Sequence, residues 1–129
     1  MSECVQTALI TGAGNGIGRA IALAMADSGR NVSCADINLD DAQRTVQAIE
    51  QQGGVAHALK ADVGSIAQIE AMIKDTVSVF GSLDIIVNNA GVTRAADIME
   101  LTEDDWGRIH RVNAKGVFFC LTRNFFHLF

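Results

Sequence analysis

The sequence predicts an α/β fold in which a doubly wound parallel sheet carries helices on both faces. Two observations predict this class. Short apolar runs alternate four times with segments of helical periodicity, and a glycine-rich turn at residues 11–18 joins the first apolar run to the first helix. Alternation of this kind is typical of parallel sheets built from right-handed crossover connections. Such a beginning predicts the strand order 3-2-1-4, with a ligand crevice beside strands 1 and 4.

The composition is that of one ordinary globular domain of 129 residues. Its net charge of −5 is spread along the chain without a basic stripe, which argues against a nucleic-acid partner. The three cysteines are widely spaced, and no two histidines have the spacing of metal ligands, so neither a disulfide framework nor a metal site is expected. This cysteine pattern fits a reducing, cytoplasmic location. The acidic start of the chain lacks the bases of a secretory leader, and no apolar run approaches the length needed to span a bilayer.

Four short apolar runs bounded by turn residues are predicted as parallel strands. They cover residues 5–10, 32–36, 55–59 and 84–88. Polar residues that can cap a helix follow three of these runs: Asn38, Ser65 and Thr102. Ser65 and Gln68 have the spacing of a capping box, and Gly81 can end the helix that they begin.

Apolar periodicity assigns an inward-facing stripe to the first and last helices. In the first helix the stripe comprises Ile17, Ile21, Ala24, Met25 and Ser28. In the last helix, which is expected to start at residue 103, it comprises Trp106, Ile109, Asn113, Val117 and Cys120. Asn113 is thus an amide on an otherwise apolar face, and a buried amide must be hydrogen-bonded. From the residues alone, it is either a satisfied core asparagine or a group of an active site.

The turn at residues 11–18 reads Thr-Gly-Ala-Gly-Asn-Gly-Ile-Gly and is a candidate phosphate-binding turn. Glycine tolerates positive φ and lets a ligand approach the backbone, and the N-terminus of the following helix favours negative charge. The spacing differs from the common Gly-x-Gly-x-x-Gly, so a plain tight connection between strand and helix is the alternative. Asp36 favours the nucleotide interpretation, because it ends the second strand, where a Rossmann fold binds the adenosine ribose.

The turn resembles that of the short-chain dehydrogenase/reductase family, and two further motifs follow in the family's order. They are Asn-Asn-Ala-Gly at residues 88–91 and Arg-Val-Asn-Ala-Lys-Gly at residues 111–116. Residues 88–94 are similar to members of the 3-oxoacyl-carrier-protein reductase type. The resemblance covers residues 5–121 and implies a partial Rossmann domain that binds NAD(P), with the later strands of the family missing.

The resemblance also implies the residues of the site. Asn113 would be the catalytic asparagine, in a segment whose backbone helps to hold a proton-relay water. Residues 62–63 would contact the adenine ring, the glycines the phosphates, and residues 88–91 would line the cofactor cleft. The cofactor-binding residues expected on this basis are Gly12, Asn15, Gly16, Ile17, Gly18, Asp36, Asp62, Val63, Asn89, Ala90 and Gly91.

Charge around the ribose site predicts NAD as the cofactor. The family's NADP-binding members carry a cation just before the second motif glycine or just after the second strand, and these places hold Asn15 and Ile37. Asp36 would repel a 2′-phosphate, whereas its carboxylate can accept hydrogen bonds from two ribose hydroxyls.

The resemblance implies hydride transfer between a nicotinamide and the carbon of a small carbonyl or alcohol substrate. In the family a tyrosine, with a lysine four residues later, moves the hydroxyl proton, but this sequence contains no tyrosine. We therefore expect residues 1–129 to form a single cofactor-binding domain that is inactive alone and that forms a homo-oligomer through its last helix. The alternative is a catalytically silent dinucleotide-binding or interaction protein that associates with a full-length relative. The aromatic tail at residues 123–129 is expected to expose apolar surface that promotes association, or else to bind another protein.

Overall fold

The computed structural model describes the backbone of residues 4–128 and the side chains of residues 4–124. Along the chain the first elements are β1 (Thr7–Thr11), α1 (Gly16–Asp27), β2 (Asn31–Asp36), α2 (Leu39–Gln51), β3 (Val55–Lys60), α3 (Ile66–Phe80) and β4 (Ile85–Val87). The short 3₁₀ helix η1 (Ile98–Glu100) then leads to α4 (Glu103–His110), the π-helical turn η2 (Arg111–Lys115) and α5 (Gly116–Leu128).

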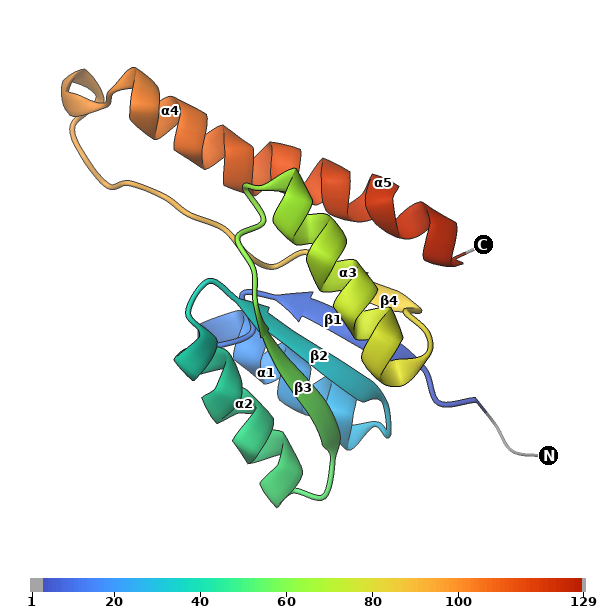
Figure 1. The fold of residues 1–129 in the computed structure, drawn as a ribbon. Coiled ribbons are helices and arrows are strands. Elements are labelled where there is room, and N and C mark those ends of the chain that lie inside the picture. Colours follow the sequence, from blue (N-terminus) through green and yellow to red (C-terminus); the bar gives the residue numbers. More distant parts are fainter. Residues whose placement is uncertain (1–3, 129) are drawn as a thin grey trace.

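The four strands form one parallel sheet in the order β3-β2-β1-β4. Helices α1 and α2 cover one face, and α3 and α5 cover the other (Figure 1). Because successive residues of a strand point to opposite faces, Ile10 packs with the α1 and α2 side, whereas Leu9 packs with the α3 and α5 side. The predicted fold class and strand order are confirmed.

Helix α1 buries small residues against the sheet, and the apolar stripe predicted for it is only partly correct. Gly18, Ala22 and Ala26 are its buried residues. Ile21 and Met25 of the stripe are partly buried against the core, but Ile17 is 75% exposed. The stripe is shifted because the helix starts in close contact with the glycine turn. A Cβ on Gly18 would collide with the turn's backbone, so the face that touches the sheet has room only for small side chains.

The last helical segment is not one regular helix, so the apolar stripe predicted for it needs correction as well. The π turn η2 separates α4 from α5 and shifts the phase of the residues after it. Cys120 is buried as expected, but Trp106 is 66% exposed and Asn113 is exposed as well. The buried face of α5 instead follows Gly116, Cys120 and Asn124.

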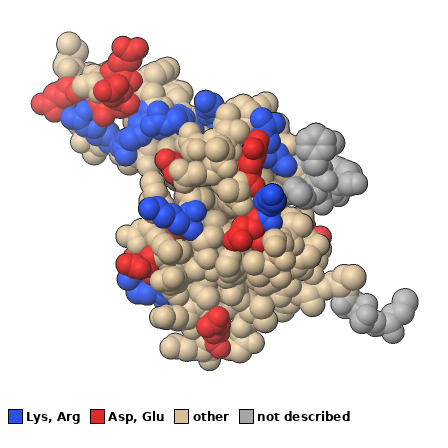
Figure 2. All heavy atoms as spheres, viewed as in Figure 1, with Lys and Arg blue, Asp and Glu red and all other residues tan. Residues whose placement is uncertain are grey.

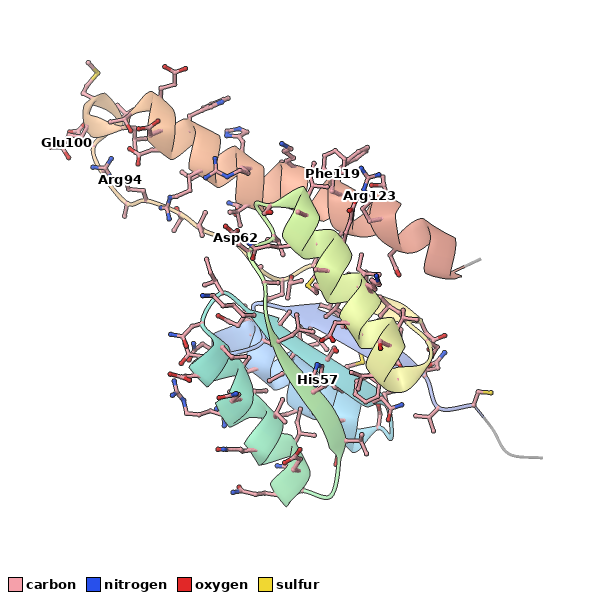
Figure 3. The ribbon with its side chains drawn as sticks, in the orientation of Figure 1. His57, Asp62, Arg94, Glu100, Phe119 and Arg123 are labelled. Atoms are coloured by element: carbon pink, nitrogen blue, oxygen red, sulfur yellow. The ribbon has the colours of Figure 1, made fainter. Side chains whose placement is uncertain are left out.

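An ion pair between Arg123 and Glu70 connects helix α5 to helix α3. Arg123 Nε lies 2.9 Å from Glu70 Oε1, and the Arg123 guanidinium lies over the Phe119 ring at 5.2 Å from its centroid (Figure 3). The phenylalanine side chains of the tail, at positions 125, 126 and 129, lie outside the described residues, so the exposure predicted for the tail stays a prediction.

Helix α4 begins with a capping box. Asp105 N donates to Thr102 Oγ1 at 3.1 Å, and Thr102 N donates to Asp105 Oδ2 at 2.9 Å. Arg94, on the loop before η1, pairs with the same carboxylate (Figure 3). The backbone hydrogen bond from Thr102, helped by the Thr102 side chain and Arg94, holds the pKa of Asp105 below its ordinary value.

We expect the first turn of α4 to open when this carboxylate is neutralised. Because the pKa of Asp105 is lower in the folded chain than the unfolded value of about 3.9, its contribution to stability is present above that pH and is lost as the pH falls through the folded pKa. Exchange of the Thr102, Asp105 and Trp106 amides, which are hydrogen-bonded in this turn, should therefore accelerate below about pH 4 after correction for intrinsic rates. Asp105→Ala should show the faster exchange at neutral pH too, and unchanged protection there would contradict the assignment.

Candidate functional site

The glycine turn lies between β1 and α1, at the carboxyl edge of the sheet. Gly12 (φ 65°) and Gly16 (φ 55°) have the left-handed backbone that favours glycine. A Cβ on Gly18 would lie 2.5 Å from Asn89 Nδ2 and closer still to the Gly12 carbonyl oxygen. The turn therefore aims the N-terminus of α1, the positive end of its dipole, toward this edge of the sheet.

Asp36 ends β2 beside the same turn. Its carboxylate accepts from Gly14 N at Oδ2 and from Asn38 N at Oδ1, both at 2.9 Å. A Cβ on Gly14 would lie 2.8 Å from Asp36 Oδ2 and 2.5 Å from Asp41 Cβ, so residue 14 has to be glycine as well. Gly14 is not among the cofactor-binding residues expected from the sequence. Each carboxylate oxygen has a second lone pair, so both can also accept from a ligand hydroxyl.

A cavity of about 160 Å³ opens at this edge. The carboxyl ends of all four strands and the π turn η2 contribute to its wall. Six of the residues predicted from the sequence line it, namely Gly12, Asp36, Asp62, Val63, Ala90 and Gly91. Thr11, Ile37, Ala61, Val92 and Val112 complete the lining. Among the described residues, the lining thus holds two carboxylates and no lysine or arginine.

Asn89 acts on this cavity through the backbone, because it ties the turn after β4 to the glycine turn. Its Nδ2 donates to the carbonyl oxygens of Thr11 (3.1 Å) and Gly12 (3.3 Å). In return, Thr11 Oγ1 accepts from Asn89 N at 3.1 Å and from Ala90 N at 3.0 Å. These bonds fix two walls of the cavity relative to each other.

Asn15, Gly16, Ile17 and Gly18 lie at the start of α1, outside the cavity lining. The Asn15 side chain turns toward α2, where its Nδ2 donates to Asp41 Oδ2 at 2.9 Å. Together these residues form the edge of the turn next to Gly12. Contact with a bound phosphate stays a prediction for them.

Asp62 lies between the end of β3 and the start of α3 (Figure 3). Its Oδ1 accepts from Gly64 N at 2.8 Å, and its own N–H donates to Gln68 Oε1 at 2.8 Å. Gln68 N donates to Ser65 Oγ at 3.3 Å, so only half of the predicted capping box forms. The Gln68 side chain instead holds the loop of Asp62 against α3.

Asn113 lies in the π turn η2 and forms a two-way hydrogen bond with one residue. Its Nδ2 donates to the Val92 carbonyl oxygen at 2.7 Å, and its Oδ1 accepts from Val92 N at 2.8 Å. Because Val92 lines the cavity, Asn113 fixes the position of that part of the wall. The predicted need for hydrogen bonds is met, but on an exposed amide rather than on a buried one.

Thr45 is a supporting residue that sequence reasoning missed. It is fully buried on α2, and its Oγ1 donates to the Ala13 carbonyl oxygen in the glycine turn at 2.8 Å. The sequence carries one signal of it, a hydroxyl on the apolar stripe of the second helix beside Val46.

The two buried cysteines are not reactive groups. Burial raises the pKa of Cys34 to about 12 and that of Cys120 to about 11, so both are inert thiols at neutral pH. No group of three metal-ligating side chains gathers within the described part of the chain. No helix among the described residues has the length and apolarity needed to cross a bilayer.

Comparisons with protein families, curated proteins and solved structures all match dehydrogenases or reductases. The family model of the short chain dehydrogenases matches residues 6–128. A 3-oxoacyl-[acyl-carrier-protein] reductase of Staphylococcus aureus is 42% identical over 122 residues, which cover 94% of this chain and 50% of that protein. A probable tetrahydroxynaphthalene reductase of Zymoseptoria tritici is 38% identical over 124 residues, which cover 95% of this chain and 46% of that protein.

A solved structure, that of hydroxysteroid dehydrogenase from Escherichia coli, superposes with a TM-score of 0.87 at 36% identity. The match covers 92% of this chain and 50% of that one. The chain thus spans about half the length of the relatives it matches. With the parallel sheet, the glycine turn and a family match over nearly its whole length, the chain belongs to the short-chain dehydrogenase family.

Proposed function

We propose that this chain binds NAD for an oxidoreductase that transfers hydride between the nicotinamide and the carbon of a small carbonyl or alcohol substrate. The observation that carries the proposal is the cavity at the carboxyl edge of the sheet, where the glycine turn and Asp36 meet residues 62–63. Parallel α/β sheets bind dinucleotides in this crevice. A cytoplasmic location would suit such an enzyme.

The residues around the cavity fit a dinucleotide. Adenine would lie beside Asp62 and Val63, and the ribose hydroxyls would donate to Asp36. The pyrophosphate would lie against the glycine turn at the N-terminus of α1. Asn89 would keep the two sides of the cleft at their spacing. The nicotinamide, when bound, donates or accepts the hydride.

The charges favour NAD over NADP. A 2′-phosphate on the adenosine ribose would meet the Asp36 carboxylate, and Ile37 and Asn15 offer it no cation. Arg44, the basic residue on α2, is paired with Asp41. Calorimetric titration of the purified chain with NAD⁺ and NADP⁺ tests the proposal, which requires binding of NAD⁺ and weaker binding of NADP⁺.

We also propose that Asn113 belongs to the substrate end of the site. Its amide fixes the Val92 backbone. The resemblance to the family implies a proton-relay water held by the backbone of the same segment, which here is the π turn η2. Asn113 would thus act on the reaction by positioning the backbone around it.

The 129-residue chain by itself is expected to bind NADH without oxidising it when a 3-oxoacyl thioester is offered. Reduction of the carbonyl needs a proton donor, and the tyrosine that serves in the family does not occur in this sequence. The loss of absorbance of the reduced cofactor measures turnover, and the Staphylococcus aureus reductase, assayed with NADH and with NADPH, provides the positive control. Turnover that disappears in Asn113→Ala would contradict the expectation.

The surface of α4 and α5 favours a second candidate role in association. Trp106, Phe118 and Leu121 are 66%, 58% and 61% exposed, an unusual amount of apolar surface for two short helices. Figure 2 shows acidic side chains at the far end of α4 and basic ones along it toward the sheet, an arrangement that suits an antiparallel copy of itself. We propose a homo-oligomer through this surface, or a silent chain that pairs with a longer relative there; light scattering of the purified chain tests the first.

A further inference from the structure

The peptide unit between Ala13 and Gly14, in the middle of the glycine turn, is held from two sides. Its N–H donates to Asp36 Oδ2 at 2.9 Å, and its carbonyl oxygen accepts from Thr45 Oγ1 at 2.8 Å. Because a peptide unit is planar and stiff, bonding both its N–H and its C=O fixes its rotation. The orientation of this unit therefore depends on Thr45 of α2 as directly as on Asp36 of β2.

The Thr45 hydroxyl makes its better hydrogen bond to the glycine turn and not to its own helix. Its hydroxyl lies 2.8 Å from the Ala13 carbonyl oxygen but 3.4 Å from that of Asp41, which is the common partner of a threonine inside a helix. Only the shorter distance is that of a good hydrogen bond. The side chain is fully buried, so its hydroxyl carries a desolvation cost that this one bond offsets.

Other contacts from α2 reach the neighbouring residues of the turn. Asn15 Nδ2 donates to Asp41 Oδ2 at 2.9 Å, and the backbone of Gly14 passes so close to Asp41 that a Cβ on Gly14 would lie 2.5 Å from Asp41 Cβ. Helix α2 thus supports the turn from behind, on the side away from the cavity, and Thr45 is the buried member of this support.

We propose that Thr45 is a positioning residue for the phosphate-binding turn, a role that rests on the proposed dinucleotide function. Without its hydroxyl, the Ala13 carbonyl would lose its partner in a buried place, and the peptide unit would rotate toward water. The same rotation carries Gly14 N away from Asp36. A ligand would then bind only the fraction of chains whose turn is native, and its apparent affinity falls by that fraction.

Thr45→Val removes the hydroxyl with little change in shape, and Thr45→Ser keeps it. Thr76→Val is the matched control, because Thr76 is equally buried and its Oγ1 lies 2.9 Å from Ser33 Oγ and from the Met72 carbonyl oxygen, on the other face of the sheet. Three quantities are measured in each variant of the whole chain: the Kd for NAD⁺ by calorimetry, the midpoint of thermal unfolding, and hydrogen exchange of the Gly14 amide by NMR.

Thr45→Val should weaken NAD⁺ binding roughly tenfold, which corresponds to about 1.4 kcal/mol, and should speed exchange of the Gly14 amide. Thr45→Ser should restore both. Thr76→Val should lower the unfolding midpoint while leaving the Kd and the Gly14 exchange rate at their wild-type values.

Equal effects of Thr45→Val and Thr76→Val on the Kd and on Gly14 exchange would overturn the proposal, since Thr45 would then act only on stability. Wild-type Gly14 exchange in Thr45→Val would overturn it too. If the wild-type chain binds neither NAD⁺ nor NADP⁺, the proposed function fails, but the exchange comparison still decides whether Thr45 positions the turn.

Discussion

Replacing Gly18 by alanine is expected to abolish dinucleotide binding and to lower the free energy of unfolding by about 3 kcal/mol. The added Cβ would overlap the Gly12 carbonyl oxygen and lie 2.5 Å from Asn89 Nδ2. Neither atom can retreat easily, because Asn89 Nδ2 is itself bonded to the carbonyl oxygens of Thr11 and Gly12. Relief of the overlap would therefore separate α1 from the turn and open the cavity wall. Urea denaturation measures the first effect and calorimetry with NAD⁺ the second.

Gly107→Ala is the matched control for this substitution. Gly107 lies inside α4, and a Cβ added there would have no atom within 4 Å. Because alanine restricts the unfolded chain and favours helix, this variant should be more stable than the wild type by about 0.5–1 kcal/mol. A lower free energy of unfolding in Gly18→Ala and a higher one in Gly107→Ala would show that close packing, and not helix propensity, determines the effect at position 18. A Gly18→Ala chain with wild-type stability and binding would refute the role given to this glycine.

The fold could be predicted where local signals agree with the overall pattern. Asn38, Ser65 and Thr102 each accept a backbone N–H at the start of a helix, as their positions predict. The strand order follows from the alternation of strands with helices. The stripes of α1 and of the last helical segment could be predicted only in part, with Ile21, Met25 and Cys120 correct. The rest depends on the contact at Gly18 and on the π turn around Asn113, neither of which is visible in apolar periodicity.

The residues that line the cavity could be predicted where they lie at the carboxyl ends of strands. Asp36 and Asp62 follow neighbouring parallel strands, so a single sheet edge brings them to one cavity. Thr45 and Gly14 were beyond prediction, because their roles depend on how closely α2 packs behind the turn. Asn15, by contrast, was predicted from its place in the turn, but it does not line the cavity, and its side chain bonds to Asp41 of α2.

Neutralising Asp36 and adding a cation beside it should reverse the cofactor preference. In the double variant Asp36→Asn, Ile37→Arg, the amide oxygen keeps an acceptor for one of the two backbone N–H groups that Asp36 binds. Ile37 is 63% exposed and leaves room for arginine. The repulsion between the carboxylate and a 2′-phosphate is replaced by attraction to a guanidinium. We expect the ratio of the Kd values for NADP⁺ and NAD⁺ to fall by at least about 100-fold, or about 2.7 kcal/mol.

Asp62→Asn is the control for this ratio, since it removes the other carboxylate of the cavity lining, which follows the neighbouring strand β3 at the same edge of the sheet. It should change the affinities for NAD⁺ and NADP⁺ alike, because adenine is common to both. Using the ratio cancels any general loss of folded protein, which would otherwise imitate weaker binding. The single variant Asp36→Asn tests the Asp36 charge without the added arginine. If it changes the ratio no more than Asp62→Asn does, the Asp36 charge does not select the cofactor. The same conclusion would follow if the wild-type chain bound NADP⁺ as tightly as NAD⁺.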